Sequence, residues 1–119
     1  MNVKDIIKRI KIENENERQR IKEKIVKAFE EIEQLKRDFL RIDHEMEKMI
    51  LFGSLAEDRI ESMDFDIDIA VKSDKYYQLV ARALESEFKV DVVDLEIVHE
   101  SIKKNILENG RLIYEKDKD

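Results

Sequence analysis

The 119-residue chain has no cysteine, no proline and no tryptophan, and it has only two glycines. Without cysteine it forms neither disulfides nor thiolate metal sites, which is compatible with the reducing cytoplasm that we expect as its compartment. No proline-rich or low-complexity stretch marks a linker. No run approaches the ~20 apolar residues of a membrane span, and the charged first residues lack the apolar segment of a secretory signal. We therefore expect no membrane association.

Charge is abundant but unevenly spread. Charged residues make up 44% of the chain and hydrophobic residues 42%, which is enough for one modest core and for solvated helices. Residues 1–50 hold 13 Lys and Arg against 12 Asp and Glu, while residues 51–119 hold 10 against 17, which together give the net charge of −6. A protein that binds a nucleic-acid duplex normally presents a basic face, so nucleic acid is not an expected partner.

One long amphipathic helix is expected at residues 21–42. Apolar residues recur there at alternating three- and four-residue steps, as they do along one face of a helix: Ile21, Ile25, Ala28, Phe29, Ile32, Leu35, Phe39 and Ile42. This stripe either packs on the helix's own domain or forms a seam with a second helix, as in a homo-oligomer. The unequal sizes of Ala28 and Phe39 favour packing on its own domain. A short helix at residues 1–12 is also predicted, and the polar residues 13–20 form either a break or the frayed start of the long helix.

After residue 47 the pattern changes to that of alternating strands and helices. Strands are expected at residues 49–52, 66–72, 89–98 and 111–114, and helices at residues 73–88 and 99–109, with Gly110 as the last C-terminal cap. The expected inward positions of these two helices are Tyr76, Val80, Leu84 and Phe88, and Ile102, Ile106 and Leu107. The order predicts an α/β (α+β) fold with a small mixed sheet and flanking helices at residues 46–119, preceded by a helical extension at residues 1–45.

Acidic residues alternate with apolar ones in the expected strand "DFDIDIAV", although aspartate is a poor strand former. Asp66 and Asp68 fall on one face, about 6–7 Å apart at a rise of ~3.3 Å per residue. Two carboxylates so close repel each other by roughly 1–3 kcal/mol, and one is expected to hold a proton unless a counter-charge is present. A divalent cation relieves the repulsion and prefers oxygen ligands.

Two neighbouring features extend this acidic pair into a possible site. Gly53 ends a buried strand and is followed by Ser54, so a tight turn can bring backbone N–H groups and a hydroxyl to a phosphate. On the next strand, Asp91 and Asp94 are three residues apart and so lie on opposite faces, which lets at most one of them join the cluster. Three carboxylates beside such a turn suit two-metal phosphoryl or nucleotidyl transfer.

The segments "LFGS", "DFDIDIAV", "KVDVVDLE" and "ILENGRLIYE" together resemble the minimal nucleotidyltransferase (MNT) domain of the polymerase-beta-like nucleotidyltransferase superfamily. The resemblance covers about residues 46–115. It implies two Mg²⁺ ions, a nucleoside triphosphate as substrate, and transfer of a nucleoside monophosphate, with AMP from ATP favoured, to a hydroxyl acceptor. It also implies a helical HEPN-type partner, with this chain as the antitoxin that adenylylates its toxin.

The resemblance assigns roles to five residues. Asp66 and Asp68 would ligate both Mg²⁺ ions, and Asp91 would bind the ion that activates the attacking hydroxyl, which makes these three the expected catalytic and metal-binding residues. Asp94 replaces Asp91 if the register differs. Gly53 and Ser54 would hold the β- and γ-phosphates. Asp64 would remain outside this inner set.

Two positions depart from the family's frequent pattern Gly-Ser-Arg-Ala-x-Gly. Leu55 stands where the arginine would be and Asp58 where the second glycine would be. Losing a cation and adding an acid weakens triphosphate binding, unless Arg59 substitutes. Two alternatives to an active enzyme therefore stay open: a catalytically weak or inactive nucleotidyltransferase-fold protein that binds a partner through the helix at residues 21–42, and a structural protein that self-associates through it.

Overall fold

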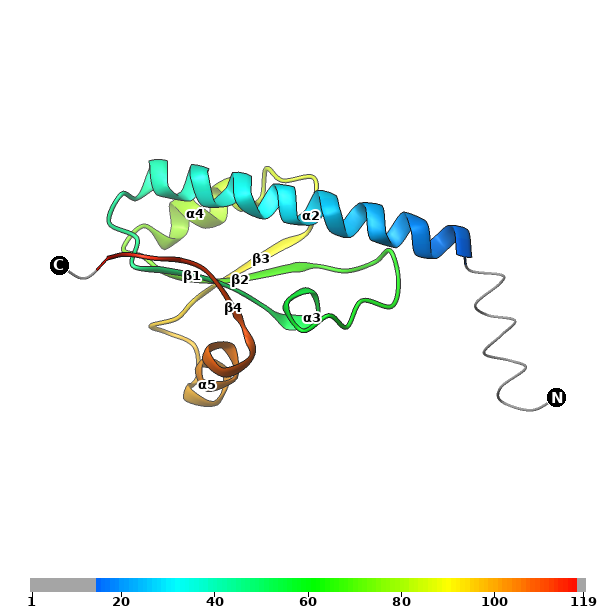
Figure 1. The fold of residues 1–119 in the computed structure, drawn as a ribbon. Coiled ribbons are helices and arrows are strands. Elements are labelled where there is room, and N and C mark those ends of the chain that lie inside the picture. Colours follow the sequence, from blue (N-terminus) through cyan, green and yellow to red (C-terminus); the bar gives the residue numbers. More distant parts are fainter. Residues whose placement is uncertain (1–14, 118–119) are drawn as a thin grey trace.

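The computed structural model describes residues 15–117, so the helix expected at residues 1–12 lies outside the described residues. One long helix runs across a four-stranded sheet that carries shorter helices (Figure 1). The elements in chain order are α2 (Glu15–Ile42), β1 (Lys48–Phe52), α3 (Gly53–Ala56), β2 (Ile67–Lys72), α4 (Tyr76–Ala83), β3 (Val90–Asp94), α5 (Glu100–Asn109) and β4 (Arg111–Glu115). This confirms the predicted α+β fold with a long N-terminal helix. Within residues 15–117, no helix is both long and apolar enough to cross a membrane.

The sheet is mixed, with the strand order β3-β2-β1-β4. Strand β1 runs antiparallel to β2 and to β4, whereas β2 and β3 are parallel. The end of β1 therefore lies beside the start of β2, and the start of β2 lies beside the start of β3. In this register Asp68 is paired with Phe52 on one side and with Asp91 on the other. Three segments that are distant in sequence thus meet at one end of the sheet.

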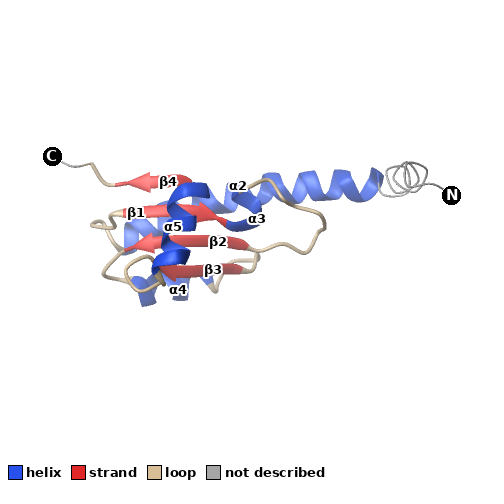
Figure 2. Cartoon of the chain, turned by 90° about the horizontal axis from the view of Figure 1, so that it is seen from below, coloured by secondary structure: helices blue, strands red, loops and turns tan. Residues whose placement is uncertain are grey.

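Helices cover both faces of the sheet. Helices α2 and α4 lie on one face and α5 on the other, as the view from below shows (Figure 2). The α2 stripe is buried from Ala28 to Phe39 against the sheet, in the same core as Leu51 and Ile69. The prediction that this stripe packs on its own domain is therefore confirmed for these positions. The smaller core on the α5 side consists of Ile50, Ala70, Leu95 and Ile106.

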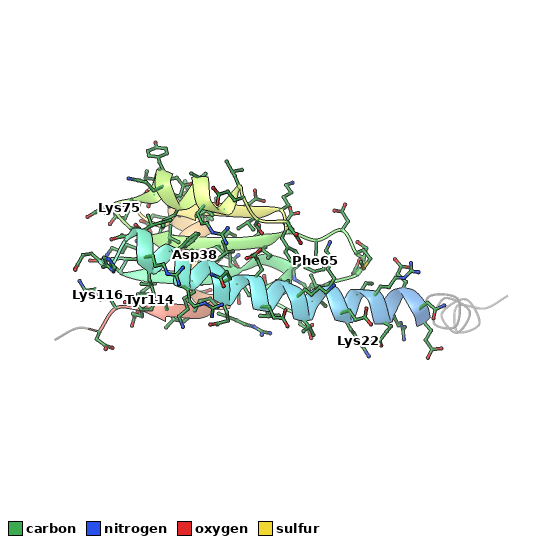
Figure 3. The ribbon with its side chains drawn as sticks, turned by 90° about the horizontal axis from the view of Figure 1, so that it is seen from above. Lys22, Asp38, Phe65, Lys75, Tyr114 and Lys116 are labelled. Atoms are coloured by element: carbon green, nitrogen blue, oxygen red, sulfur yellow. The ribbon has the colours of Figure 1, made fainter. Side chains whose placement is uncertain are left out.

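An ion-pair cluster joins the two helices on the α2 face. Arg82 on α4 donates from Nε to Asp38 Oδ2 of α2 at 2.7 Å, and its guanidinium lies 3.7 Å from Glu31. The side chains of Arg82 and Asp38 are only 18% and 19% exposed. Figure 3 shows Asp38 where α2 passes α4. The guanidinium hydrogen bond is the main cause that lowers the pKa of Asp38.

Helix α4 is shorter than predicted, and its buried face is different. It spans Tyr76–Ala83 rather than residues 73–88. Ser73 does not cap it, because its hydroxyl accepts from the Lys75 N–H in the preceding turn and donates to Asp43. Leu79 and Ala83 are its buried residues, whereas Leu84 follows the helix and is 78% exposed. Of the expected inward residues, Tyr76 and Phe88 do pack against the main core, but Leu84 does not, because the helix ends before it.

Two boundaries and the buried face of α5 also need comparison with the sequence prediction. Helix α2 includes residues 15–20, so of the two predicted alternatives the start of the helix is correct and the break is not, since its Glu, Arg and Gln residues favour helix. Strand β3 ends at Asp94 rather than residue 98, because a turn follows in which Ile97 and Val98 donate to the Asp94 carbonyl. In α5 only Ile106 is buried, while Ile102 and Leu107 are each 49% exposed. Gly110 is the C-cap of α5, as predicted.

Candidate functional site

The turn after β1 requires glycine. Gly53 has a φ of +77°, in the left-handed region that L side chains rarely adopt. A Cβ atom at this position would lie 2.3 Å from Oδ2 of Asp68. The turn therefore brings its backbone directly against the Asp68 carboxylate. Ser54 follows in the short helix α3, whose first N–H groups have no partner within the helix.

The strand pairing brings Asp68 and Asp91 together. They are register partners on the parallel strands β2 and β3, so their side chains lie on the same face of the sheet. Asp66 lies two residues before Asp68 and shares that side, while Ile67 and Ile69 are fully buried on the opposite side. This side of the sheet is the one that carries α5.

Asp94 lies away from this cluster, on the other face and at the far end of β3. Its carboxylate accepts the N–H of Glu96 in the following turn. Burial, and then the charge of Asp94, raise the pKa of Tyr76 on α4. Because that helix covers the opposite face of the sheet, Asp94 belongs to the α4 side. Of the two acids left open by the sequence, the structure places Asp91 beside Asp68.

The carboxylates influence one another electrostatically. Burial is the largest cause that raises the pKa of Asp68, and the negative charges of Asp91 and then Asp66 raise it further. Lys89 opposes these effects. Its Nζ lies 3.5 Å from Oδ2 of Asp66. The cluster thus contains three acids and one lysine, and its burial and like charges disfavour the ionised form of Asp68.

A cleft of about 440 Å³ opens at this end of the sheet. It is lined by Ser54, Arg59, Ile60, Glu61, Ser62, Asp64, Phe65, Asp66, Asp68 and Lys89. Four acids therefore face two bases in the lining, and Asp91 lies next to the cleft rather than in it. A triphosphate carries several negative charges, so a cleft with this lining needs added cations to hold one.

The two departures from the family pattern occupy structurally distinct positions. Leu55 is 3% exposed and belongs to the main core, so it does not line the cleft. Asp58 has a φ of +56°, which explains why glycine is frequent at the corresponding position. Arg59 does line the cleft, as a replacement for the missing cation would, but its guanidinium now lies 3.0 Å from Glu57 and its side chain is 62% exposed.

Sequence reasoning missed Lys89 as a residue of the site. The signal was its position two residues before Asp91, since that spacing puts both side chains on one face of a strand. Asp64, which the sequence placed outside the inner set, lies in the loop before β2 and lines the cleft together with Asp66 and Asp68. The site thus uses this loop as well as the strands.

The donor atoms of the cluster suit Mg²⁺, but their present arrangement does not enclose an ion. Carboxylate oxygens are the ligands that Mg²⁺ prefers, and the raised pKa of Asp68 reflects a repulsion that a cation relieves. Within residues 15–117, however, no three acidic or histidine side chains are arranged so as to hold a metal ion. Asp66 is turned toward Lys89. A cation bound at Asp66 would compete with this ion pair to Lys89.

Comparison with known proteins gives one matching family, described as "Polymerase beta, Nucleotidyltransferase", over residues 33–119. The comparison with curated protein sequences gave no match. Among solved structures, a toxin–antitoxin with AMP-PNP matches at 26% identity with a TM-score of 0.54, covering 71% of this chain and 73% of that chain. A mutant of the toxin–antitoxin MntA-HpeT matches at 23% identity with a TM-score of 0.53, covering 73% and 72%.

A third structure contains the tri-AMPylated Shewanella oneidensis HEPN toxin in complex with the MNT antitoxin. It matches at 23% identity with a TM-score of 0.50, and the alignment covers 73% of this chain and 69% of that chain. At these identities the second and third matches show similarity of fold alone. The family match covers β1 to β4 and the C-terminal part of α2, and so includes the whole cleft.

Proposed function

This chain belongs to the polymerase beta nucleotidyltransferase family, and we propose that it transfers AMP from ATP to a hydroxyl group of a protein acceptor. One observation carries the proposal: the turn at Gly53 packs against Asp68, and Asp68 is paired in register with Asp91. A turn with exposed N–H groups can hold phosphate oxygens, while paired carboxylates can hold the cations that such phosphates need. Their contact puts both functions within one small site.

Each residue of the site has a role in this proposal. Asp66, Asp68 and Asp91 would hold two Mg²⁺ ions, which when bound neutralise the phosphate charge and favour the ionised form of the acceptor hydroxyl. Gly53 and Ser54 would bind the β- and γ-phosphates through backbone N–H groups and the serine hydroxyl. Lys89 would be released from Asp66 when that carboxylate turns to the metal, and is then free to meet a phosphate oxygen.

The proposed reaction is an in-line displacement at the α-phosphorus of ATP. A bond forms between the acceptor oxygen and the α-phosphorus, and the bond from the α-phosphorus to the oxygen bridging to the β-phosphate breaks. The electron pair leaves with pyrophosphate, and the hydroxyl proton passes to water or to Asp91. Asp91 is suited to this position because it lies beside Asp68 at the exposed edge of the cleft.

The acceptor is proposed to be a HEPN-type toxin, for which this chain would be the antitoxin. Support comes from the 26%-identical match to a toxin–antitoxin with AMP-PNP, which covers more than two thirds of both chains. The site also has room for an acceptor on another chain, because the cleft is bordered on one side by the exposed Asp91 and Lys89. The acceptor hydroxyl would approach from that side.

The first experiment measures binding and transfer separately. We expect ATP with Mg²⁺ to raise the melting temperature, and the double variant Asp66→Ala/Asp68→Ala to abolish the rise. Mass spectrometry of a co-expressed HEPN-type toxin should show added AMP with the wild-type chain and none with the double variant. The pair Asp91→Asn and Asp94→Asn tests the third carboxylate, because only the first substitution should abolish transfer.

A binding module without catalysis is the second candidate function. The observations that favour it are the two departures from the family pattern, with Leu55 buried in the core in place of the arginine and Asp58 in place of the glycine. It predicts that the toxin is bound and neutralised equally by the wild-type chain and by Asp66→Ala/Asp68→Ala. Neutralisation that disappears with the double variant, while binding remains, would instead support catalysis.

A further inference from the structure

The loop between α3 and β2, residues 57–66, alternates between two environments. Phe65 is 8% exposed and belongs to the main core, and its neighbours Asp64 and Asp66 line the cleft. Phe65 borders the cleft as well as the core, so the way in which residues 63 and 65 are held determines where the two acids point. Helix α2 lies next to this loop, and Figure 3 shows it running past the labelled Phe65.

Lys24 of α2 contacts this loop at two points. Its ammonium group donates a hydrogen bond to the main-chain carbonyl of Met63. The same nitrogen lies 4.7 Å from the centre of the Phe65 ring and 5.9 Å from that of Phe88, both within the range of a cation–π interaction. The stem of this half-buried lysine crosses from α2 to the loop. One side chain thus fixes the backbone before Asp64 and the ring before Asp66.

We propose that Lys24 is a positioning residue for the acidic site: it holds the loop so that Asp64 and Asp66 face the cleft. The inference rests on the proposed function for the role of Asp66 in binding Mg²⁺. Lys24 is not among the residues that line the cleft, so it acts through the loop rather than on a ligand. Residues that orient a metal-binding carboxylate in this way influence its affinity for the cation.

The test compares three variants of the full chain. Lys24→Met keeps a long unbranched side chain but removes the charge and the donor. Lys24→Arg keeps the cation, the donor and the ability to lie over an aromatic ring. Lys27→Met is the matched control, because Lys27 is an exposed lysine on the same helix. Two quantities are measured for each: amide hydrogen exchange of residues 57–66, and the Mg²⁺ concentration that gives the half-maximal ATP-dependent rise in melting temperature.

We expect Lys24→Met to speed amide hydrogen exchange in residues 57–66. We also expect it to raise the required Mg²⁺ concentration about tenfold, which is the lower end of the loss in metal affinity seen when a group that orients a metal ligand is removed. Lys24→Arg and Lys27→Met should resemble wild type in both measurements. A lysine that only stabilises the fold would lower the melting temperature and leave the Mg²⁺ dependence unchanged, and that result would overturn the proposal.

The two proposals fail in different ways. If the wild-type chain shows no response to ATP and Mg²⁺, the proposed function fails, while the exchange measurement alone still decides whether Lys24 orders the loop. If wild type responds and exchange of residues 57–66 is the same in Lys24→Met as in Lys27→Met, the positioning role is wrong and the proposed function stands.

Discussion

Asp68 lies directly beside Asp91 in the parallel register of β2 and β3, and a Cβ on Gly53 would touch its carboxylate. The fold therefore presses one carboxyl group between a second acid and a turn. This arrangement disfavours the charged form of Asp68, since burial and then the two neighbouring acids raise its pKa. Ionisable residues that lower the stability of the fold in this way are typical of functional sites, because binding or catalysis requires them there.

We predict that Asp68→Asn stabilises the chain at pH 7 without metal and abolishes transfer. A carboxyl group with a raised pKa binds its proton more tightly when folded, so its contribution to stability is complete below the unfolded value of 3.8 and is lost as pH rises through the folded pKa. Removing repulsion between carboxylates ~6 Å apart is worth about 1 kcal/mol in the free energy of unfolding, or about 3–5 °C in melting temperature. Thermal unfolding from pH 4 to pH 8 measures this.

The gain in unfolding free energy of Asp68→Asn over wild type should shrink as the pH falls toward 4, because protonation then removes the charge of Asp68 in the wild-type chain. Asp74→Asn is the control, since Asp74 is exposed and follows the end of β2 that lies away from the cluster. An Asp68→Asn variant that is less stable than wild type at pH 7 would show that hydrogen bonding by the carboxylate outweighs the repulsion.

The contact between α2 and α4 should depend on Arg82 far more than on the other arginine near Asp38. Arg82→Leu leaves a mostly buried carboxylate without its 2.7 Å hydrogen bond, which should cost about 1–2 kcal/mol of unfolding free energy. Arg41 lies 3.2 Å from the same carboxylate but is 74% exposed, so Arg41→Leu should cost less than about 0.5 kcal/mol. Urea unfolding at pH 7 measures both.

The pH dependence of the unfolding free energy separates the contribution of the Arg82 charge from that of its packing. Its hydrogen bond lowers the pKa of Asp38, so the associated stability is present above the unfolded value of 3.8 and is lost as pH falls through the folded pKa. The difference between wild type and Arg82→Leu should therefore narrow below about pH 4. A difference that is constant down to pH 2 would mean that only the apolar stem of Arg82 matters.

The central elements could be predicted from the sequence because local pattern and burial agree there. The alternation around Ile67 and Ile69 and the buried stripe of α2 each follow one period and lie in the main core. The apolar run before Gly53 is buried on both faces, with Leu51 in the main core and Ile50 in the smaller one. The expected opposite directions of Asp91 and Asp94 also followed from the two-residue period of a strand. Where a single period governs a buried segment, few other arrangements bury the same side chains.

The ends of elements and the long-range contacts of the site could not be derived in this way. The end of α4 at Ala83 is set by a turn in which Glu85 and Ser86 donate to carbonyls of the last helical turn, and no proline or glycine marks it. Lys24 and Met63 are 39 residues apart in sequence, so only the packing of α2 brings them together. A lysine on an amphipathic helix carries no signal that distinguishes it from its solvated neighbours.

Asp58 is predicted to be a strained position that glycine would relieve. Its φ of +56° costs an ordinary side chain about 1 kcal/mol, although a short polar side chain tolerates it better than most. Asp58→Gly should therefore raise the free energy of unfolding by up to about 1 kcal/mol, and Asp58→Ala should lower it by a similar amount. Chemical denaturation of the three proteins measures this ranking. If Asp58→Gly is no more stable than wild type, the left-handed conformation at this position is not strained.

The two glycines should respond differently to the same substitution, because only one of them belongs to the site. Gly53→Ala combines a left-handed φ with a Cβ 2.3 Å from the Asp68 carboxylate, so we expect about 1–3 kcal/mol of destabilisation and loss of the ATP-dependent thermal shift. Gly110→Ala also crowds its neighbours, at 2.5 Å from Ile106 O and from Ile50 Cγ2, but it does so beside α5. It should lower stability while the remaining folded protein binds ATP with unchanged affinity. Titration calorimetry at 10 °C below each melting temperature would compare the two, and equal loss of ATP affinity in both would remove Gly53 from the nucleotide site.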